Sequence, residues 1–191
     1  MSDGINTPDE LADSKLTVIT YREELRAAFE QLNRDWIERY FVLEQADRDV
    51  FSDPETSIRA RGGEIFFVVD GTRALGTCAV LRHKADEYEI AKMAVASFAR
   101  GRGLGDRLME AAIGFARERG ARKVAIVSNT ILEPALRLYR KHGFVEVPLA
   151  ADSRYQRANI RMELDLIGGE PAQPRTHPGG NSRAQGSTGP S

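Results

Sequence analysis

The sequence predicts a protein of the α/β class, because short apolar strands alternate along it with amphipathic helices. The first observation is the apolar run Ile90 to Val95, which suits a buried strand and is followed by a glycine-rich turn and an amphipathic helix. The second is a pair of apolar runs, Ile65 to Val69 and Ala74 to Leu81. Asp70-Gly71 separates them, and Asp-Gly between apolar runs is a strong signal for a β-hairpin.

A strand and several helices are predicted before this hairpin. The run LTVIT, which begins at Leu16, is rich in β-forming residues and predicts a first strand. Residues 44 to 61 are polar and broken by Ser52-Asp53-Pro54, which predicts two short helices, the second capped by Asp53. A longer helix is predicted between the first strand and residue 44. Core packing is the expected role of its apolar stripe, formed by Leu25, Phe29, Leu32, Trp36 and Tyr40.

The second half of the chain continues the alternation. The helix after the glycine-rich turn should end near Gly120, and a buried strand follows at Val124 to Val127. A short helix from Glu133 to His142 precedes two closing strands, Phe144 to Val147 and Ile160 to Leu166. The helix after the glycine-rich turn presents one apolar face, formed by Leu104, Leu108, Ala111, Ala112 and Phe115.

Composition limits the class of protein. The chain of 191 residues is 41% hydrophobic and 29% charged, which is ordinary for a globular protein, and its net charge of −1 gives no field to attract nucleic acid or anionic membrane. Cys78 is the single cysteine and the three histidines are scattered, so we expect no disulfide within the chain and no metal site. Without an apolar run long enough to span a membrane and with a polar N-terminus, the protein is expected to be cytoplasmic.

One domain, from residue 15 to 167, accounts for the predicted elements. Residues 1–14 lack hydrophobic periodicity and are expected to be a flexible tail. Residues 168–191 are rich in Gly, Pro and Ser and poor in apolar residues, which predicts a disordered tail.

The turn from Arg100 to Gly105 predicts an anion-binding site. Glycine lets the backbone approach a ligand closely, and the unpaired N–H groups that begin the following helix attract negative charge. A P-loop is set aside because the last glycine is followed by Asp-Arg rather than by Lys and then Ser or Thr. A dinucleotide fingerprint is set aside because the glycines are spaced G-x-G-x-G. A pyrophosphate or a similar polyanion is the expected ligand.

What remains is R-x-x-G-x-G, formed by Arg100, Gly103 and Gly105, which resembles the acyl-CoA loop of the GNAT superfamily of N-acetyltransferases. The segment EIAKMAV at 89–95 and a segment with Asn129, Ala135, Leu138-Tyr139 and Gly143-Phe144 resemble those of small bacterial single-domain members. The resemblance covers about Leu16 to Leu166. It implies the GNAT fold, in which helices flank a mixed, mostly antiparallel sheet, and it implies acetyl-CoA as the co-substrate without any metal.

The resemblance also implies roles for particular residues. Tyr139 matches the tyrosine that many members use as a general acid, and Glu89 matches a strand glutamate that some members use as a base; a core tyrosine and a solvated strand-end charge are the structural alternatives. Asn129 would bind the cofactor arm or a water, or else be a turn residue. The expected acetyl-CoA contacts are Met93, Ala94, Val95, Arg100, Gly101, Arg102, Gly103, Leu104, Gly105, Asn129 and Tyr139.

Acceptor residues in this superfamily lie outside the cofactor motifs, chiefly in the first helices and the last hairpin. Trp36 and Tyr40 also belong to the apolar stripe, which favours core packing for both. As a hypothesis, Arg157 would bind a substrate carboxylate, which would suit an amino-acid-like amine. Lys92 lies within an apolar strand, where pairing with a carboxylate is the favoured role. The candidates for substrate contact are Asn33, Trp36, Arg39, Tyr40, Tyr155 and Arg157.

Three functions are compatible with these residues. The favoured one is an acetyl-CoA-dependent N-acetyltransferase that acts on the primary amine of a small molecule by direct attack in a ternary complex. The others are a protein Lys or N-terminal acetyltransferase and a non-catalytic acyl-CoA-binding module. The resemblance allows a homodimer, since GNAT proteins are often dimers, but no interface can be read from the sequence. Nucleic acid is not an expected partner, because one pyrophosphate explains the arginines near position 100 and no aromatic platform lies beside them.

Overall fold

The structure is a computed structural model that describes residues 16–149 and 154–167. The tails predicted at residues 1–14 and 168–191 therefore lie outside the described residues. The described strands form a seven-stranded sheet in the order β1-β2-β3-β4-β5-β7-β6. Their bounds are β1 Leu16–Thr20, β2 Glu64–Asp70, β3 Arg73–Arg82, β4 Glu87–Val95, β5 Lys123–Ser128, β6 Val145–Val147 and β7 Ile160–Asp165.

Five α-helices and three short 3-10 turns connect these strands in the described chain. The α-helices are α1 Arg26–Tyr40, α2 Gln45–Ser52, α3 Pro54–Ser57, α4 Leu104–Glu118 and α5 Glu133–Lys141. The 3-10 turns are η1 Glu23–Leu25, η2 Arg59–Arg61 and η3 Ser97–Ala99. None of these helices combines the length and the apolar character that crossing a membrane requires.

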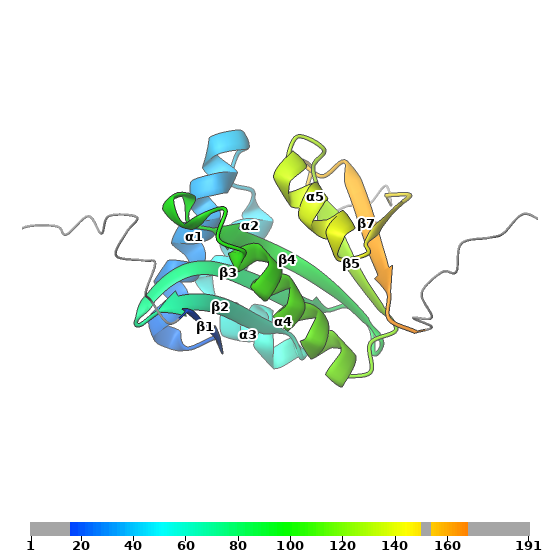
Figure 1. Ribbon diagram of the computed structural model, residues 1–191, viewed down its shortest axis with the longest axis horizontal. Helices are drawn as coiled ribbons and strands as arrows, with labels where there is room; N and C mark the ends of the chain where they lie inside the picture. Colours follow the sequence, from blue (N-terminus) through cyan, green and yellow to red (C-terminus); the bar gives the residue numbers. More distant parts are fainter. Residues whose placement is uncertain (1–15, 150–153, 168–191) are drawn as a thin grey trace, which may run out of the picture.

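The sheet is mixed, as the resemblance implies. Strands β1 to β4 pair antiparallel in chain order, β4 and β5 pair parallel, and β7 lies between β5 and β6 in antiparallel register with both. Helix α4 connects the two parallel strands and crosses one face of the sheet, whereas α1 and α2 lie on the other face (Figure 1). Three layers result, with the sheet in the middle.

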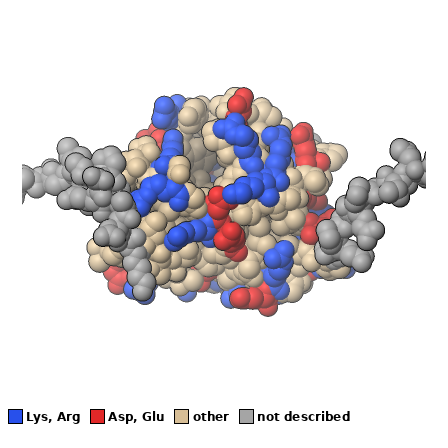
Figure 2. All heavy atoms as spheres, in the orientation of Figure 1, with Lys and Arg blue, Asp and Glu red and all other residues tan. Residues whose placement is uncertain are grey.

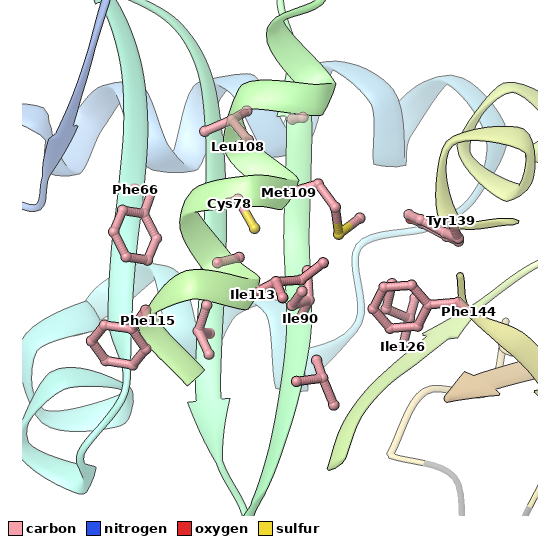
Figure 3. Close-up of a cluster of buried hydrophobic side chains, with 14 of the residues drawn as sticks. Phe66, Cys78, Ile90, Leu108, Met109, Ile113, Phe115, Ile126, Tyr139 and Phe144 are labelled. Atoms are coloured by element: carbon pink, nitrogen blue, oxygen red, sulfur yellow. The ribbon is translucent and has the colours of Figure 1, made fainter. Parts of the chain in front are cut away.

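The alternation of side chains in β2 explains these layers. Phe66 and Val68 belong to the core cluster on the α4 side, where the rings of Phe66 and Phe115 meet edge to face with centroids 5.7 Å apart (Figure 3). Phe67 and its alternate neighbours belong to the cluster beneath α1 and α2, where Phe67 meets Phe29. Because β2 is apolar on both faces, it is buried in the middle of the sheet, as a continuous apolar run predicts.

Local signals in the sequence are confirmed where they concern caps and turns. Asp53 accepts a hydrogen bond from the backbone N–H of Thr56 (2.9 Å), with Pro54 in the first turn of α3. Gly71 has φ +57° in the β2–β3 hairpin, and Gly143 has φ +87° after α5. The predicted boundaries shift by a residue or two: α1 begins at Arg26 because a 3-10 turn precedes it, and the closing strands are shorter than expected.

A β-bulge interrupts β4, and the sequence gives no sign of it. Thr77 pairs with Ala94 and Ala79 pairs with Ala91, so Lys92 and Met93 together lie opposite one residue of β3, Cys78. Lys92 has φ +52°, the one positive φ of a residue other than glycine in the described chain. A left-handed lysine costs free energy, so side-chain contacts must hold it in this conformation.

Candidate active site

A cavity of about 570 Å³ opens where β4 and β5 separate. The two strands pair only from Glu87–Lys123 to Glu89–Ala125, while β5 continues to pair with β7 as far as Ser128. Figure 1 shows the strands converging at one end and apart at the other, with α5 beside the gap. From Ile90 onward the edge of β4 that faces β5 therefore borders the cavity instead of a neighbouring strand.

Most of the residues that the sequence predicts for the site line this cavity. They are Trp36, Tyr40, Glu89, Met93, Ala94, Val95, Arg100, Gly101, Gly103, Leu104, Gly105, Asn129, Tyr139, Tyr155 and Arg157. Arg102, Asn33 and Arg39 do not line it. Lining residues that were not among the predictions include Phe41, Ser128, Ile131 and Leu138. Figure 2 shows a hollow in this face of the molecule with Lys and Arg side chains on both sides of it.

The glycine-rich turn forms one end of the cavity. Gly101 and Gly103 have φ +77° and +72°, and a Cβ placed on either would meet nothing within 4 Å, so the backbone there is open to a ligand. Gly103 is the N-cap of the fifteen-residue helix α4, whose first N–H groups and dipole favour an anion. The Nε of Arg100 donates to the carbonyl of Val95 (3.3 Å), which keeps this cation beside the end of β4.

Tyr139, on α5, lies on the opposite wall from β4. The side chain is buried, and its ring lies 6.4 Å from that of Phe144 (Figure 3). Burial raises the pKa of Tyr139 to about 12, although a hydrogen bond with Ser128 lowers it slightly. The phenol is therefore protonated throughout the neutral and mildly alkaline range and can donate a hydrogen bond into the cavity.

Glu89, on β4, faces the cavity near the end where β4 and β5 still pair. Its Oε2 lies 2.7 Å from Nε2 of His83, which follows β3 and is about half exposed. The hydrogen bond with Glu89 raises the pKa of His83 above its ordinary value, against burial and the charges of Arg161 and Arg154, which lower it. His83 was not among the predicted residues, because it lies in a turn with no recognisable motif.

Asn129 ends β5, and both ends of its amide already have protein partners. Nδ2 donates to the carbonyl of Arg157 (2.6 Å), and Oδ1 accepts from the backbone N–H of Ile131 (3.0 Å). The amide thus ties the end of β5 to the segment that leads into β7. It lines the cavity while serving as a turn residue, the structural alternative that its position suggested.

Four charged side chains form a cluster centred on Asp47, and two of them, Lys92 and Arg157, line the cavity. The carboxylate of Asp47, fully buried, accepts from Lys92 Nζ (2.7 Å) and from both terminal nitrogens of Arg157 (2.7 Å each). Glu44 accepts from Arg157 Nη1 (3.0 Å) and forms a capping box with Asp47 at the start of α2. Lys92 also donates to the hydroxyl of Tyr155 (2.6 Å). The sequence favoured pairing of Lys92 with a carboxylate, and the structure confirms this with Asp47, a carboxylate on α2.

Aromatic side chains form the wall near this cluster. Trp36, Tyr40, Phe41 and Tyr155 all line the cavity. The core-packing role expected for Tyr40 is wrong, because this residue is the last of α1 and is 46% exposed. Trp36 is partly buried, and packs against both core clusters.

The expected substrate contact of Asn33 is also corrected. Its side chain is fully buried, donates to the carbonyl of Phe29 (2.9 Å) and accepts from Nε1 of Trp36 (3.3 Å). Asn33 therefore orients Trp36 from within α1 and has no surface in the cavity. Arg39 lies over the ring of Tyr40, at 5.6 Å, and lines a smaller neighbouring cavity of about 210 Å³.

Comparison with known proteins places this arrangement in a family. The sequence model of the acetyltransferase (GNAT) family matches residues 22–144, which include most of the residues that line the cavity, the glycine-rich turn and Tyr139. The chain belongs to the GNAT family of acetyltransferases and is therefore an acyltransferase enzyme. GNAT acetyltransferases use acetyl-CoA, and the seven-stranded open sheet flanked by helices is their fold.

The individual proteins that resemble this chain share a limited part of its sequence or only its fold. Mycothiol acetyltransferase of Corynebacterium glutamicum is 34% identical over 84 residues, which are 44% of this chain and 29% of the relative. This chain thus matches less than a third of that protein. A GNAT-family acetyltransferase from Staphylococcus aureus has the same fold with a TM-score of 0.73 at 15% identity, covering 80% of this chain and 99% of its own. The structure of the protein yncA from Salmonella typhimurium includes its cofactor acetyl-CoA. It has a TM-score of 0.62 at 16% identity, and the match covers 81% of this chain and 96% of yncA.

Proposed function

We propose that this enzyme transfers an acetyl group from acetyl-CoA to the primary amine of a small molecule, by direct attack within a ternary complex. The observation that supports it is the cavity beside β4 and α5, which is lined both by the open anion-binding turn and by the aromatic side chains of Trp36, Tyr40 and Phe41. Glu89 and Tyr139 both line it, from opposite elements, so one cavity contains candidates for the two proton transfers that amide formation needs.

The residues at the turn fit acetyl-CoA. Open backbone at Gly101 and Gly103, the N-terminus of α4 and the charge of Arg100 together suit a pyrophosphate. The unpaired edge of β4, from Ile90 to Val95, offers backbone groups to an amide-containing arm. When bound, acetyl-CoA supplies an acetyl thioester, which is already activated toward an amine.

The protein's own groups would handle the protons. Glu89, at the cavity wall and in contact with solvent through His83, is suited to accept the proton that an ammonium must lose before it attacks. Tyr139 retains its proton because of burial, and is suited to donate it to the departing sulfur. Its high pKa makes it a modest acid, but a thiolate that leaves in a buried site needs its proton close by.

Calorimetric titration with acetyl-CoA is the first test, with Arg100→Ala as the variant and Arg122→Ala, an exposed arginine remote from the cavity, as the matched control. Binding that weakens in Arg100→Ala alone supports the cofactor assignment. A thiol-release assay over a panel of primary amines, with the acetylated product identified by mass spectrometry, then tests the acceptor class.

Two results would favour the other functions. Release of thiol with lysine-containing peptides or a protein N-terminus, but with no small amine, would indicate a protein acetyltransferase. Binding of acetyl-CoA without any turnover, by wild type and by Tyr139→Phe alike, would indicate a binding module.

A further inference from the structure

Cationic groups at the acceptor end of the cavity are already neutralised by the protein. Among the described residues, three cations line the cavity: Lys92, Arg100 and Arg157. Arg100 lies at the anion-binding turn. The other two, near the aromatic wall, both bind Asp47, and Arg157 binds Glu44 as well.

The charges within this cluster balance. Two carboxylates, Asp47 and Glu44, face two cations, Lys92 and Arg157, and the side chains of Asp47 and Lys92 are at most 4% exposed. Both terminal nitrogens of Arg157 are engaged by carboxylate oxygens, and Lys92 donates to Asp47 and to Tyr155. A carboxylate that entered from the cavity would have to displace an internal carboxylate from each cation, with no gain in pairing.

The same wall suits a cation with an apolar body. Tyr40 exposes 46% of its surface, and Trp36 and Phe41 also line the cavity, whereas the ring of Tyr155 already lies against Lys92 and Arg157. Aromatic faces attract ammonium groups and pack against apolar side chains. Two carboxylates line the cavity among the described residues, Glu89 and Asp106, and Asp106 is paired with Lys141 and His142, so Glu89 favours an ammonium in the cavity over an anion.

From this arrangement, and resting on the proposed function, we propose that the acceptor is a primary amine with an aromatic or apolar body and no carboxylate, and that Glu44 and Asp47 enforce this choice by neutralising Arg157 and Lys92 at the cavity wall. This replaces the amino-acid-like acceptor for which Arg157 was a candidate ligand. Glu44 and Asp47 are positioning residues in this scheme, since they act through the cations and do not touch the substrate.

Three amines with one ring system test the proposal: phenethylamine, phenylalaninamide and phenylalanine. The amide and the acid have nearly the same size, so their ratio of kcat/KM isolates the negative charge. We expect phenylalaninamide to exceed phenylalanine by at least about tenfold, because the carboxylate would lose its hydration without gaining a free cation. Phenethylamine should be used at least as well as the amide.

The Glu44→Gln variant tests the positioning role. It removes one negative charge from a side chain that is 22% exposed, which leaves the cluster with a net positive charge while Asp47 still holds both cations. The ratio of kcat/KM for phenylalanine over phenylalaninamide should rise about threefold or more. Asp49→Asn, an equivalent loss of charge on the exposed side of α2, is the matched control and should leave the ratio unchanged.

The outcomes separate the two proposals. If wild-type enzyme uses phenylalanine as well as its amide, the inference is wrong while the proposed function stands. An unchanged ratio in Glu44→Gln would remove the positioning role of that carboxylate. If the enzyme binds acetyl-CoA but acetylates no amine of the series or of a wider panel, the proposed function fails and the inference fails with it.

Discussion

Nε2 of His83 lies 2.7 Å from Oε2 of Glu89, so the candidate base at the cavity wall has a partly exposed imidazole as its immediate partner. The pKa of His83 is raised by this contact, and the pair is ionic over a wider range of pH than a free histidine would allow. The positive charge of His83 is therefore lost only when the pH increases through this raised pKa, and the ion pair with Glu89 is lost with it.

Replacing His83 by Gln should remove a pH-dependent step from the kcat/KM profile. In wild type the ion pair with Glu89 is present below the pKa of His83, which the hydrogen bond with Glu89 raises, and it is lost as the pH increases through that pKa. Gln can keep a hydrogen bond to Glu89 but carries no charge, so the profile of the variant should lack this step. Because His83 is about half exposed, the step should stay below about tenfold. Identical pH profiles in the two proteins would remove His83 from the site's proton chemistry.

Tyr139→Phe should lower kcat by about 100-fold, the lower end of the range for a general acid, because a phenol is a weak one. Acetyl-CoA affinity should change little, since the ring and its contact with Phe144 remain. Calorimetry and steady-state kinetics on the same preparation separate the two effects. A variant with unchanged kcat would mean that another group protonates the leaving sulfur.

Acid should destabilise the protein through Asp47. Burial alone would raise the pKa of this carboxyl, but the hydrogen bond from Arg157 and the charge of Lys92 outweigh it and lower the pKa to about 2, from an ordinary 3.8. A group with a depressed folded-state pKa stabilises the protein above its unfolded-state pKa and loses that contribution as pH falls. About 2 kcal/mol should therefore be lost between pH 4 and 2.

The Asp47→Asn variant checks that attribution. Its free energy of unfolding at neutral pH should be about 3 kcal/mol lower than that of wild type, because two buried cations lose their shared partner. Its urea midpoint should also fall less between pH 4 and 2, since the titrating group is gone. Midpoints that decline in parallel in both proteins would assign the acid sensitivity to other carboxylates.

Two glycines of α4, one at its N-cap and one in its interior, should have opposite effects on stability when each is replaced by alanine. Gly103 has φ +72°, so Gly103→Ala should cost about 1–2 kcal/mol of stability and weaken acetyl-CoA binding. Gly114 lies inside α4 with nothing within 4 Å of an added Cβ, and Gly114→Ala should gain about 0.5–1 kcal/mol. Thermal unfolding and calorimetry check both. Equal effects of the two substitutions would contradict the conformational argument.

Features set by neighbours in the chain were predictable from the sequence. The Asp53 cap, the Asp70-Gly71 hairpin and the glycine-rich turn each depend on a few adjacent residues, and the structure confirms them. The amphipathic period of α4 likewise places Leu108 and Phe115 in the core. Taken together, these local signals were enough to predict the order of the helices and strands and to recognise the resemblance to the family.

Features set by distant pairs were not predictable. Lys92 and Asp47 are 45 residues apart, and Arg157 is 110 residues from Asp47, so no local pattern links them. The bulge that turns Lys92 toward α2 depends on a register shift against β3. Tyr40 fits the helical period, but the period does not say where the sheet beneath α1 ends, and the ring therefore lies in the cavity instead of the core.

The short pairing of β4 with β5 has a consequence for how the protein opens. Three residue pairs connect the strands β1 to β4 with the strands β5 to β7, so the backbone pairing of the sheet is narrowest at this seam. Local opening should begin there, and amide hydrogens of β5 should exchange with solvent more readily than those of β3, which has a paired neighbour along most of both edges. A ligand that binds both sides of the seam would slow this exchange on each of them.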